Sequence, residues 1–493
     1  MKRVFLINFS TPILVDVARN LKARGIEIIY WQGYRDAFDE LAATRAGFEG
    51  TIFWHAFDAV KCVPPPEAGS DAFEPLSSDI IERMYMHGWP SLSMLSRADY
   101  AHSPFVKRRH IYYRYLKYWW GMLKKFKPDA VVFISVPHSA LGFVLYRLAQ
   151  VLNIKTIILY GLSQSIDSRA LVLNDFALGS RALEQEYQRI KDASRTVQDL
   201  SDDLQEHYLS QKHARVPGGA PDERYAHLLS KDNKMPFRVP TLKTIARHLW
   251  HFTFFKTAKS YLSMLFSKRK TPYFGGNLTG LQMMLLTRRW SRMRKEFQRE
   301  YAALEVRPDY RKKYVYIPLA FQPEMTTCPM GGVFDDQLLM IDTVASALPE
   351  GWAVYVKEHL PQWFAHHTET HLYRYEGYYR EIASMKNVHL VPAETHPYEL
   401  IKNAQAVATV TGSSGWEGIL RGKPALVFGY AWYMHCDGVF QVSNKDECRA
   451  ALAAIQGDYQ VSEQRVINFL AALDKVSVRV KNYKTRDYIQ NRE

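Results

Sequence analysis

The sequence predicts an α/β protein in which two Rossmann-like domains face each other across a cleft, with a basic helical segment between them. The chain of 493 residues is longer than a single hydrophobic core usually serves. Apolar stretches of strand length alternate with stretches of helical spacing near the N-terminus and again after residue 312. The composition, 47% hydrophobic and 23% charged, is typical of globular proteins and excludes wholesale disorder.

The first half of the chain contains two strand-helix-strand patterns. The predicted strands cover residues 3–8, 26–31, 130–135 and 155–160, and the predicted helices cover 12–24, 110–126 and 141–152. Residues 184–210 are polar with mixed charge, which predicts a solvated helix. We assign residues 1–230 to an N-terminal Rossmann-like domain.

The alternation becomes regular after Lys312. The predicted strands cover residues 314–321, 353–358, 388–392, 406–411 and 424–428, and the helices between them cover 335–348, 375–385, 398–403 and 415–421. Five strands with four intervening helices favour a parallel, doubly wound sheet. Residues 312–493 therefore form a predicted C-terminal Rossmann-like domain that ends with a helical tail from residue 462.

The positive charge is concentrated between the two predicted domains. Residues 233–295 contain fourteen Lys or Arg and no Asp or Glu, which equals the net charge of +14 for the whole chain. Apolar runs such as residues 249–255 lie among these cations, and an apolar face beside a basic one is typical of helices at anionic membrane surfaces. We expect residues 231–311 to be a basic amphipathic connector that docks on such a membrane. A solvated connector is the alternative, and the lack of a nucleic-acid motif predicts no nucleic-acid partner.

The cysteines and the apolar segments indicate the cellular compartment of the protein. The four cysteines contain no C-x-x-C pair, which argues against a zinc module and against a secreted disulfide framework. The apolar run near the N-terminus is too short for a signal peptide, and residues 130–146 are too short to cross a bilayer. We expect a cytoplasmic protein that is peripheral at the inner face of the cytoplasmic membrane.

The loops that follow the predicted strands are the candidate ligand sites, because open α/β sheets bind ligands beyond the carboxyl ends of their strands. In Thr411–Gly418, small residues precede a helix whose amide groups could hold a phosphate. The residues predicted to bind there are Gly412, Ser413, Ser414, Gly415 and Glu417. A capping box between Ser414 and Glu417 would explain the same pattern without a ligand.

Other strand ends carry titratable or polar side chains. The candidates for binding a donor are His396, Pro397, Gln322, Lys357 and His359, and the candidates for catalysis are Asp335, Asp336, Glu358 and His138. Asp335 and Asp336 could instead favour the dipole of the helix that follows them. No cluster of metal ligands is evident, so we expect no metal.

The motifs of several enzyme classes are missing from the sequence. It contains no G-x-G-x-x-G, Walker, H-E-x-x-H or G-x-S-x-G pattern, which removes the main support for dehydrogenase, P-loop, zincin and α/β-hydrolase activities.

The loop motifs together resemble the bacterial capsule polysaccharide biosynthesis family. The resemblance rests on residues 316–323, Lys357-Glu358-His359, His396-Pro397, Thr411 to Glu417, and residues 422–429. It implies the GT-B architecture of retaining Kdo transferases that use CMP-Kdo, with an acceptor-side N-terminal domain. It also implies that His396, Ser413 and Ser414 hold the donor and that Glu417 supports the loop or a ribose hydroxyl. The chain departs from the family pattern at His359-Leu360-Pro361, where a His-Pro pair is expected.

The resemblance implies a glycosyltransferase that builds a surface polysaccharide or glycolipid. A CMP-linked sugar such as Kdo would be the donor co-substrate, a glycan or glycolipid the acceptor, and no cofactor would be tightly bound. A nucleotide-sugar epimerase on the same fold and a non-catalytic assembly component remain the alternatives.

Overall fold

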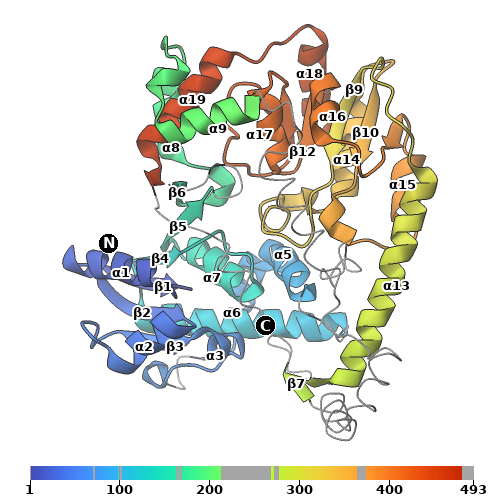
Figure 1. Ribbon diagram of the computed structural model, residues 1–493. Helices are drawn as coiled ribbons and strands as arrows, with labels where there is room; N and C mark the ends of the chain where they lie inside the picture. The colour runs from blue at the N-terminus through green and yellow to red at the C-terminus, as the bar shows by residue number, and fades with distance from the viewer. Residues whose placement is uncertain are drawn as a thin grey trace, which may run out of the picture.

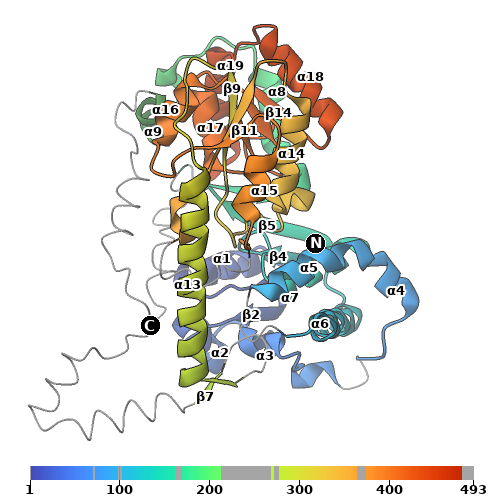
Figure 2. The same ribbon diagram turned by 90° about the vertical axis from the view of Figure 1, so that its right-hand side faces the viewer.

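The protein contains two α/β domains, one above the other in Figures 1 and 2. The computed structural model describes residues 2–69, 73–97, 99, 103–162, 166, 169–212, 268–270, 277–363 and 373–479. Within these residues, a seven-stranded sheet forms the lower domain and a six-stranded sheet forms the upper one. Most of the basic stretch 233–295 lies outside the described residues.

The N-terminal sheet is built on five parallel strands. Its strand order is β15-β6-β5-β4-β1-β2-β3, and β6 and β15 join one edge in antiparallel orientation. The strands are β1 (Arg3–Ile7), β2 (Glu27–Gly33), β3 (Ile52–His55), β4 (Ala130–Phe133), β5 (Lys155–Gly161), β6 (Arg169–Leu173) and β15 (Val478–Arg479). Strands β3, β6 and β15 were not predicted from the sequence.

Helices cover both faces of this sheet, as the continuously apolar strands require. They are α1 (Pro12–Ala23), α2 (Asp36–Thr44), α3 (Ala56–Val60), α4 (Ser78–Arg83), α5 (Tyr85–Ser96), α6 (Phe105–Phe126) and α7 (Ala140–Val151). Along β1, Val4 and Leu6 belong to one buried cluster, whereas Phe5 and Ile7 belong to the cluster that includes α5, α6 and α7. This alternation is the period of two expected for a strand.

The C-terminal sheet is entirely parallel. Its order is β11-β10-β9-β12-β13-β14, so the order of the strands along the chain runs outward in opposite senses from β9 and from its parallel neighbour β12. The strands are β9 (Tyr314–Pro318), β10 (Ala353–Lys357), β11 (Val388–Leu390), β12 (Ala406–Thr409), β13 (Ala425–Val427) and β14 (Val439–Gln441). The helices are α14 (Gln337–Ala347), α15 (Tyr378–Ser384), α16 (Pro397–Asn403), α17 (Ser413–Leu420), α18 (Lys445–Gln456) and α19 (Glu463–Val476). The five predicted strands are confirmed, and β14 is a sixth.

A long helix, α13 (Gly280–Leu304), follows the hairpin of β7 (Lys268–Lys270) and β8 (Asn277–Thr279). Figures 1 and 2 show α13 running from the upper domain down to the level of the lower one. Its C-terminal half belongs to the core of the C-terminal domain, because Phe297 and Tyr301 are buried there. Glu300 accepts hydrogen bonds from the backbone amides of Gly377, Tyr379 and Arg380 at the start of α15.

Two helices of the first half of the chain pack against the second half. Helices α8 (Arg181–Ile190) and α9 (Asp202–Lys212) bury Leu183, Tyr187 and Tyr208 in a cluster that also contains Trp416 and Phe469. The prediction of one solvated helix over 184–210 is therefore wrong. The predicted N-terminal domain ends at residue 230 and so includes α8 and α9. In the structure these two helices pack against residues of the C-terminal half of the chain.

The end of the chain returns to the N-terminal sheet. The Arg169 side chain of β6 is fully buried and forms ion pairs with Asp203, 2.7 Å away, and with Asp474, 2.8 Å away. The Arg169 guanidinium holds the pKa of Asp203 at about 2. One arginine thus joins β6, α9 and α19, and the two domains share elements from both halves of the sequence.

Candidate functional site

The two domains meet around Arg97, which ends helix α5. Its guanidinium donates four hydrogen bonds: to the Tyr373 hydroxyl at 3.3 Å and to the carbonyl oxygens of His138 (3.3 Å), Glu324 (3.4 Å) and Cys328 (2.8 Å). His138 lies in the loop after β4, whereas Glu324 and Cys328 lie in the loop after β9. Arg97 therefore connects loops at the carboxyl ends of strands from both sheets, where open α/β sheets bind ligands.

Two carboxyl groups near Arg97 have raised pKa values. Burial raises the pKa of Asp335 to about 6, and the nearby charge of Asp336 is a smaller contribution to that rise. Burial also raises the pKa of Glu324, although the Thr326 hydroxyl donates a hydrogen bond to it at 3.0 Å. Both residues remain partly accessible to solvent. A carboxyl group with a pKa near 6 can exchange protons close to neutral pH, which is what general acid-base chemistry requires.

The His138 ring has a defined protonation in this arrangement. Its Nδ1 atom lies 2.9 Å from the Val136 carbonyl oxygen, which can only accept, so Nδ1 carries the proton. The residue is exposed to solvent, yet the surrounding protein lowers the pKa of His138 by desolvation and Arg97 lowers it further by repulsion. The neutral ring leaves Nε2 as a basic nitrogen. The structure thus brings Asp335 and His138, two of the predicted catalytic residues, to the same interdomain site.

Asp336 has a structural explanation. It is the N-cap of α14, and its carboxylate accepts a hydrogen bond from the Leu338 amide at 3.0 Å. This agrees with the alternative that its carboxylate favours the start of the helix. Nothing in its contacts directs it toward Arg97.

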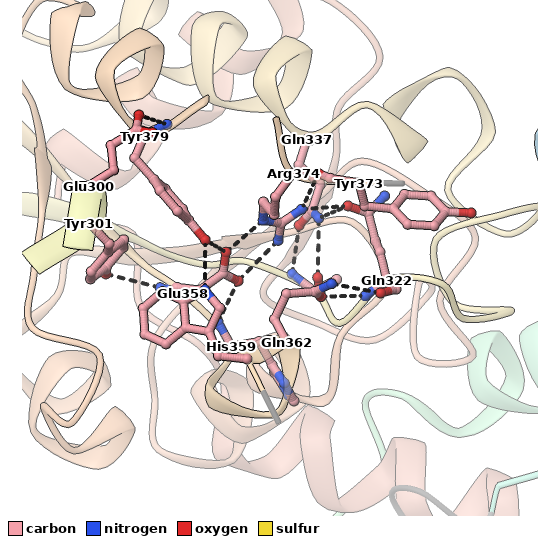
Figure 3. A network of polar contacts seen from close by, with 12 residues as sticks. Glu300, Tyr301, Gln322, Gln337, Glu358, His359, Gln362, Tyr373, Arg374 and Tyr379 are labelled. Carbon is pink, nitrogen blue, oxygen red and sulfur yellow. Dashed lines mark hydrogen bonds and ion pairs between the residues drawn. The ribbon is translucent and has the colours of Figure 1, made fainter. Parts of the chain in front are cut away.

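Glu358 lies in a buried network behind the site, shown in Figure 3. Its carboxylate accepts two hydrogen bonds from Arg374, at 2.6 and 3.0 Å, one from the Tyr379 hydroxyl at 2.5 Å and one from the His359 amide at 2.7 Å. These four donors occupy the four acceptor positions of a carboxylate, and the side chains of Glu358 and Arg374 are fully buried. The placement contradicts the prediction that Glu358 is a catalytic carboxylate.

The same network contains a predicted donor-binding residue, Gln322. Its side-chain oxygen accepts hydrogen bonds from Gln337 at 2.8 Å and Arg374 at 3.0 Å, and its main chain is bound at both N–H and C=O by Gln362. Gln322 and Lys357 are 6% and 7% exposed. Burial lowers the pKa of His359 to about 4, with repulsion from Lys357 as the next cause, so His359 is neutral. The Gln322 side chain thus holds the loop after β9 to Gln337 and Arg374, and Gln322 and Lys357 are too buried to form an open surface for a donor.

The helix α17 begins at Ser413 with Gly412 as its N-cap, and no side chain caps it. Ser413 donates a hydrogen bond to Glu417 at 3.2 Å. Because the helix begins two residues earlier than the S-x-x-E pattern implies, Ser414 is not the N-cap and the capping-box alternative is wrong. A Cβ on Gly415 would lie 2.4 Å from the Tyr433 hydroxyl, so this position requires glycine. The uncapped end provides amide groups and a positive partial charge for an anion.

The His396 loop lies beside this helix. His396 is the N-cap of α16, because its Nδ1 accepts a hydrogen bond from the Tyr398 amide at 3.1 Å, and Pro397 is the first residue of that helix. The Arg421 guanidinium lies 5.3 Å from the centre of the Tyr398 ring and donates to the Glu417 carbonyl at 2.9 Å. These contacts place α16 beside the part of α17 that contains Glu417 and Arg421.

A hydrogen bond links the helix α17 loop to the Arg97 site. The Thr411 hydroxyl donates to the Thr326 carbonyl at 2.6 Å, and Thr326 is next but one to Glu324. Glu324, Arg97 and Tyr373 were not among the residues predicted from the sequence. None of the three belongs to a motif, and only the domain arrangement places them together.

No group of three or more His, Cys, Asp or Glu in the described parts of the chain could hold a metal ion. No helix there is both long and apolar enough to cross a bilayer.

Comparison with known proteins gives a sequence match in the second half of the chain. Residues 253–462 match the family model described as capsule polysaccharide biosynthesis protein. Two capsule polysaccharide modification proteins LipA, from Neisseria meningitidis serogroups B and A, are 34% and 32% identical over 71 residues. That segment is 14% of this chain and 10% of each relative, so the chain matches about a tenth of their length.

Solved structures show a distant likeness. KpsC from Thermosulfurimonas dismutans, a β-Kdo 2,7 transferase, is 15% identical with a TM-score of 0.25, over 41% of this chain and 57% of that one. A UDP-GlcNAc 2-epimerase from Methanocaldococcus jannaschii is 10% identical with a TM-score of 0.25, over 96% and 98%. The spinosyn rhamnosyltransferase SpnG is 11% identical with a TM-score of 0.22, over 96% and 95%. The match over residues 253–462 makes this part of the chain, less than half of its length, similar to the capsule polysaccharide biosynthesis family.

Proposed function

We propose that the protein is a glycosyltransferase that transfers Kdo or another ulosonate from a CMP-linked donor to a glycan or glycolipid of the cell surface. The observation that carries the proposal is the Arg97 site, in which Asp335 and His138 come from loops of different domains. A transferase must bring two substrates together, and a site shared by two domains can bind one substrate on each.

The chemistry assigned to the site is transfer of a glycosyl group. The bond between the anomeric carbon and the donor phosphate oxygen breaks, and CMP leaves with the electron pair. A new bond forms between that carbon and an acceptor hydroxyl oxygen. The proton of the hydroxyl passes to the Asp335 carboxylate, whose pKa of about 6 leaves it ionised at neutral pH and still basic enough to accept a proton. His138 Nε2 is the second basic atom at this place.

The departing nucleotide requires stabilisation of its phosphate. We assign this role to the start of α17, where the helix end is uncapped and Ser413 is exposed. We assign binding of the rest of the donor to His396 and Glu417, because Arg421 joins their helices α16 and α17 by its contacts with Tyr398 and the Glu417 carbonyl. The proposed reaction uses no tightly bound cofactor and no metal, and it has no nucleic-acid partner.

We also propose that residues 233–295 hold the protein on an anionic membrane at the inner face of the cytoplasmic membrane, where a lipid-linked acceptor would be. The fourteen cations and the absence of acidic residues in that sequence support this part. The structure describes only 268–270 and 277–295 of it.

The proposal is tested in two steps. The first is a thermal-shift screen of CMP, UDP and GDP, because a ligand that binds only the folded state raises the melting temperature. We expect CMP to give the largest shift. The second is an assay of CMP release from CMP-Kdo with and without a lipid-linked glycan acceptor, using the Asp335→Asn variant as the inactive control. Stabilisation by UDP with epimerisation of a UDP-sugar would overturn the proposal in favour of an epimerase, and CMP binding without turnover would favour an assembly component.

A further inference from the structure

Helix α6 has an unusual charge pattern. Over its 22 residues it carries seven basic residues and no Asp or Glu. The basic residues are Lys107, Arg108, Arg109, Arg114, Lys117, Lys124 and Lys125. One side of the helix is buried in the N-terminal domain through residues such as Tyr115 and Trp119, so the cations lie toward its outer side and its exposed first turns.

Large apolar side chains are also exposed, both in the first turn of α6 and in the first turns of the neighbouring helix α5. Phe105 and Val106, in the first turn of α6, are 49% and 62% exposed. Tyr85, Met86 and Trp89, in the first turns of α5, are 74%, 79% and 71% exposed. Isolated exposed apolar residues are ordinary on protein surfaces, but five such residues on two adjoining helices indicate a contact surface.

The two helices pack directly against each other. The Tyr112 hydroxyl of α6 donates to the Met84 carbonyl, which precedes α5, at 2.8 Å. The Arg108 guanidinium donates to the Ser96 hydroxyl at the end of α5, at 2.9 Å. We call the exposed residues of these first turns, Tyr85, Met86, Trp89, Phe105, Val106, Lys107 and Arg109, the α5–α6 surface.

Two cations of this surface have no ion-pair partner among the described residues. Lys107 forms no ion pair there, and the Arg109 guanidinium lies 5.9 Å from the centre of the Phe105 ring. Acidic groups do occur on the neighbouring helix α4, where Asp79 lies 3.8 Å from Arg83 and Glu82 is exposed. Asp99 is buried and accepts a hydrogen bond from the Ser103 amide. The positive charge at the start of α6 is therefore not neutralised within the described protein.

We propose that the α5–α6 surface docks on a lipid bilayer that contains anionic lipids. Aromatic and aliphatic side chains beside unpaired cations are suited to the boundary between anionic headgroups and acyl chains. A soluble anionic glycan would use Lys107 and Arg109 but would gain little from Met86 and Val106. The charge complementarity and the exposed aliphatic residues together favour a bilayer as the occupant.

The position of the surface agrees with this role. Ser96, which Arg108 contacts, is the neighbour of Arg97 at the candidate site, so the start of α6 lies close to that site. Both views show the β7 hairpin below α6, in the same half of the molecule, and β7 belongs to the basic stretch 233–295. Delivery of a lipid-linked acceptor to Arg97 is a consequence that rests on the proposed function, whereas the docking itself does not.

The experiment measures sedimentation of the full chain with vesicles. The vesicles are phosphatidylcholine alone or an equal mixture with phosphatidylglycerol, at low and high salt. A charge variant, Lys107→Gln with Arg109→Gln, should weaken binding to the anionic vesicles about 30-fold at low salt, since each cation near such a surface contributes about fivefold. An apolar variant, Met86→Ser with Trp89→Ser and Val106→Ser, should remove the part of the binding that persists at high salt.

Matched controls distinguish docking from general surface effects. Lys445→Gln and Val172→Ser change exposed residues of the same types at other places, and Val172 is 49% exposed. They should bind vesicles like the wild type. Circular dichroism and the melting temperature should be unchanged in every variant, because the altered side chains are exposed.

Two results would overturn the proposal. One is unchanged vesicle binding in both the charge and the apolar variants. If replacement of Lys256, Lys259 and Lys270 by Gln then abolishes the binding, docking belongs to the basic stretch 233–295 alone. The other is loss of binding to soluble dextran sulfate while vesicle binding is kept, which would make the surface a site for an anionic glycan. Turnover with a soluble acceptor analogue should be unchanged in these variants, so a wild type that lacks this turnover contradicts the proposed function without affecting the docking result.

Discussion

The Arg97 guanidinium donates a hydrogen bond to the Cys328 carbonyl oxygen across the domain interface, over 2.8 Å. Its other donors reach His138, Glu324 and Tyr373, so one side chain of the N-terminal domain holds the loop of the C-terminal domain that carries Asp335. The relative position of the two domains and the geometry of the candidate site therefore depend on the same residue.

Replacing Arg97 tests this dependence. Arg97→Lys keeps the charge but cannot present donors to four acceptors in a plane, so we expect turnover to fall about 10- to 100-fold. Arg449→Gln, on the exposed face of α18, is the control and should retain full turnover. The measurement is kcat and KM for both substrates, and full turnover by Arg97→Lys would contradict the importance of the hydrogen bonds.

The adjacent residues Asp335 and Asp336 form a natural pair of variants. Asp335→Asn should reduce turnover about 100-fold, because the proton acceptor is lost. Asp336→Asn keeps an N-cap residue for α14, so turnover and stability should change little, whereas Asp336→Ala should cost about 1 kcal/mol of stability. Equal loss of turnover in Asp335→Asn and Asp336→Asn would contradict the assignment of Asp335.

The pH dependence of the same Asp335 variant gives an independent check. Since Asp335 acts as a base with a pKa of about 6, wild-type turnover should rise as the pH increases through 6. The folded pKa is raised above the ordinary value, so the folded state binds the proton more tightly and loses stability as the pH rises from about 4 to 6. Asp335→Asn should therefore raise the melting temperature at neutral pH and have little effect on it at pH 4 or below.

The double variant Ser413→Ala with Ser414→Ala tests the start of α17 as the phosphate site. Calorimetric titration with CMP should show about tenfold weaker binding, equivalent to ~1.4 kcal/mol, because two hydroxyl groups are removed from the helix end. Ser346→Ala is the matched control, since Ser346 also contacts an acidic residue four positions away on a helix. Wild-type CMP affinity in the folded double variant would refute the site.

His396 needs two variants because it caps α16 and is also a proposed donor-binding residue. His396→Asn keeps an N-cap residue, whereas His396→Ala removes the cap of α16 and should cost about 1 kcal/mol of stability. Both variants should lower donor affinity, but only the alanine variant should lower the melting temperature. If His396→Asn binds donor like the wild type, the role of His396 is limited to capping.

The Glu358–Arg374 pair should contribute to stability and not to catalysis. Glu358→Gln leaves the Arg374 charge buried without its counterion, which should cost about 3–5 kcal/mol in urea unfolding. Burial alone would raise the pKa of Glu358, but Arg374, Tyr379 and the His359 amide hold it below its ordinary value. The free energy of unfolding should therefore fall as the pH drops below about 4.3. Normal stability with lost turnover per folded molecule would instead make Glu358 catalytic.

The sequence predicts the central strands of both sheets well, for a physical reason. Strands such as β1 and β9 are buried on both faces, so they form continuous apolar runs that are visible without any partner. The edge strand β6 is different, because it has no continuous apolar run. Val172 is 49% exposed, and Arg169 is a charged residue whose burial is compensated by its ion pairs. Neither β6 nor the two-residue strand β15 has a local pattern that distinguishes it from a loop.

Only part of the candidate site could likewise be predicted from the sequence. The loops after β9 and β12 could be found from strand order, because ligand sites lie at carboxyl ends of strands. Arg97 could not be found, since it binds three main-chain carbonyl groups, which carry no residue-specific signal. Glu358 was misassigned because its partner Arg374 is sixteen residues away and its burial depends on the folded network.

The pairing of β15 with β6 has a consequence for biosynthesis. Asp474 is 305 residues after Arg169, so the Arg169 charge has both of its carboxylate partners only after the end of the chain has been synthesised. The edge of the N-terminal sheet therefore stays open on the ribosome while the C-terminal half is translated, and contacts of such long sequence separation close late. We expect a nascent chain that stops before residue 463 to expose β6, which would make that edge a binding site for chaperones and a starting point for aggregation.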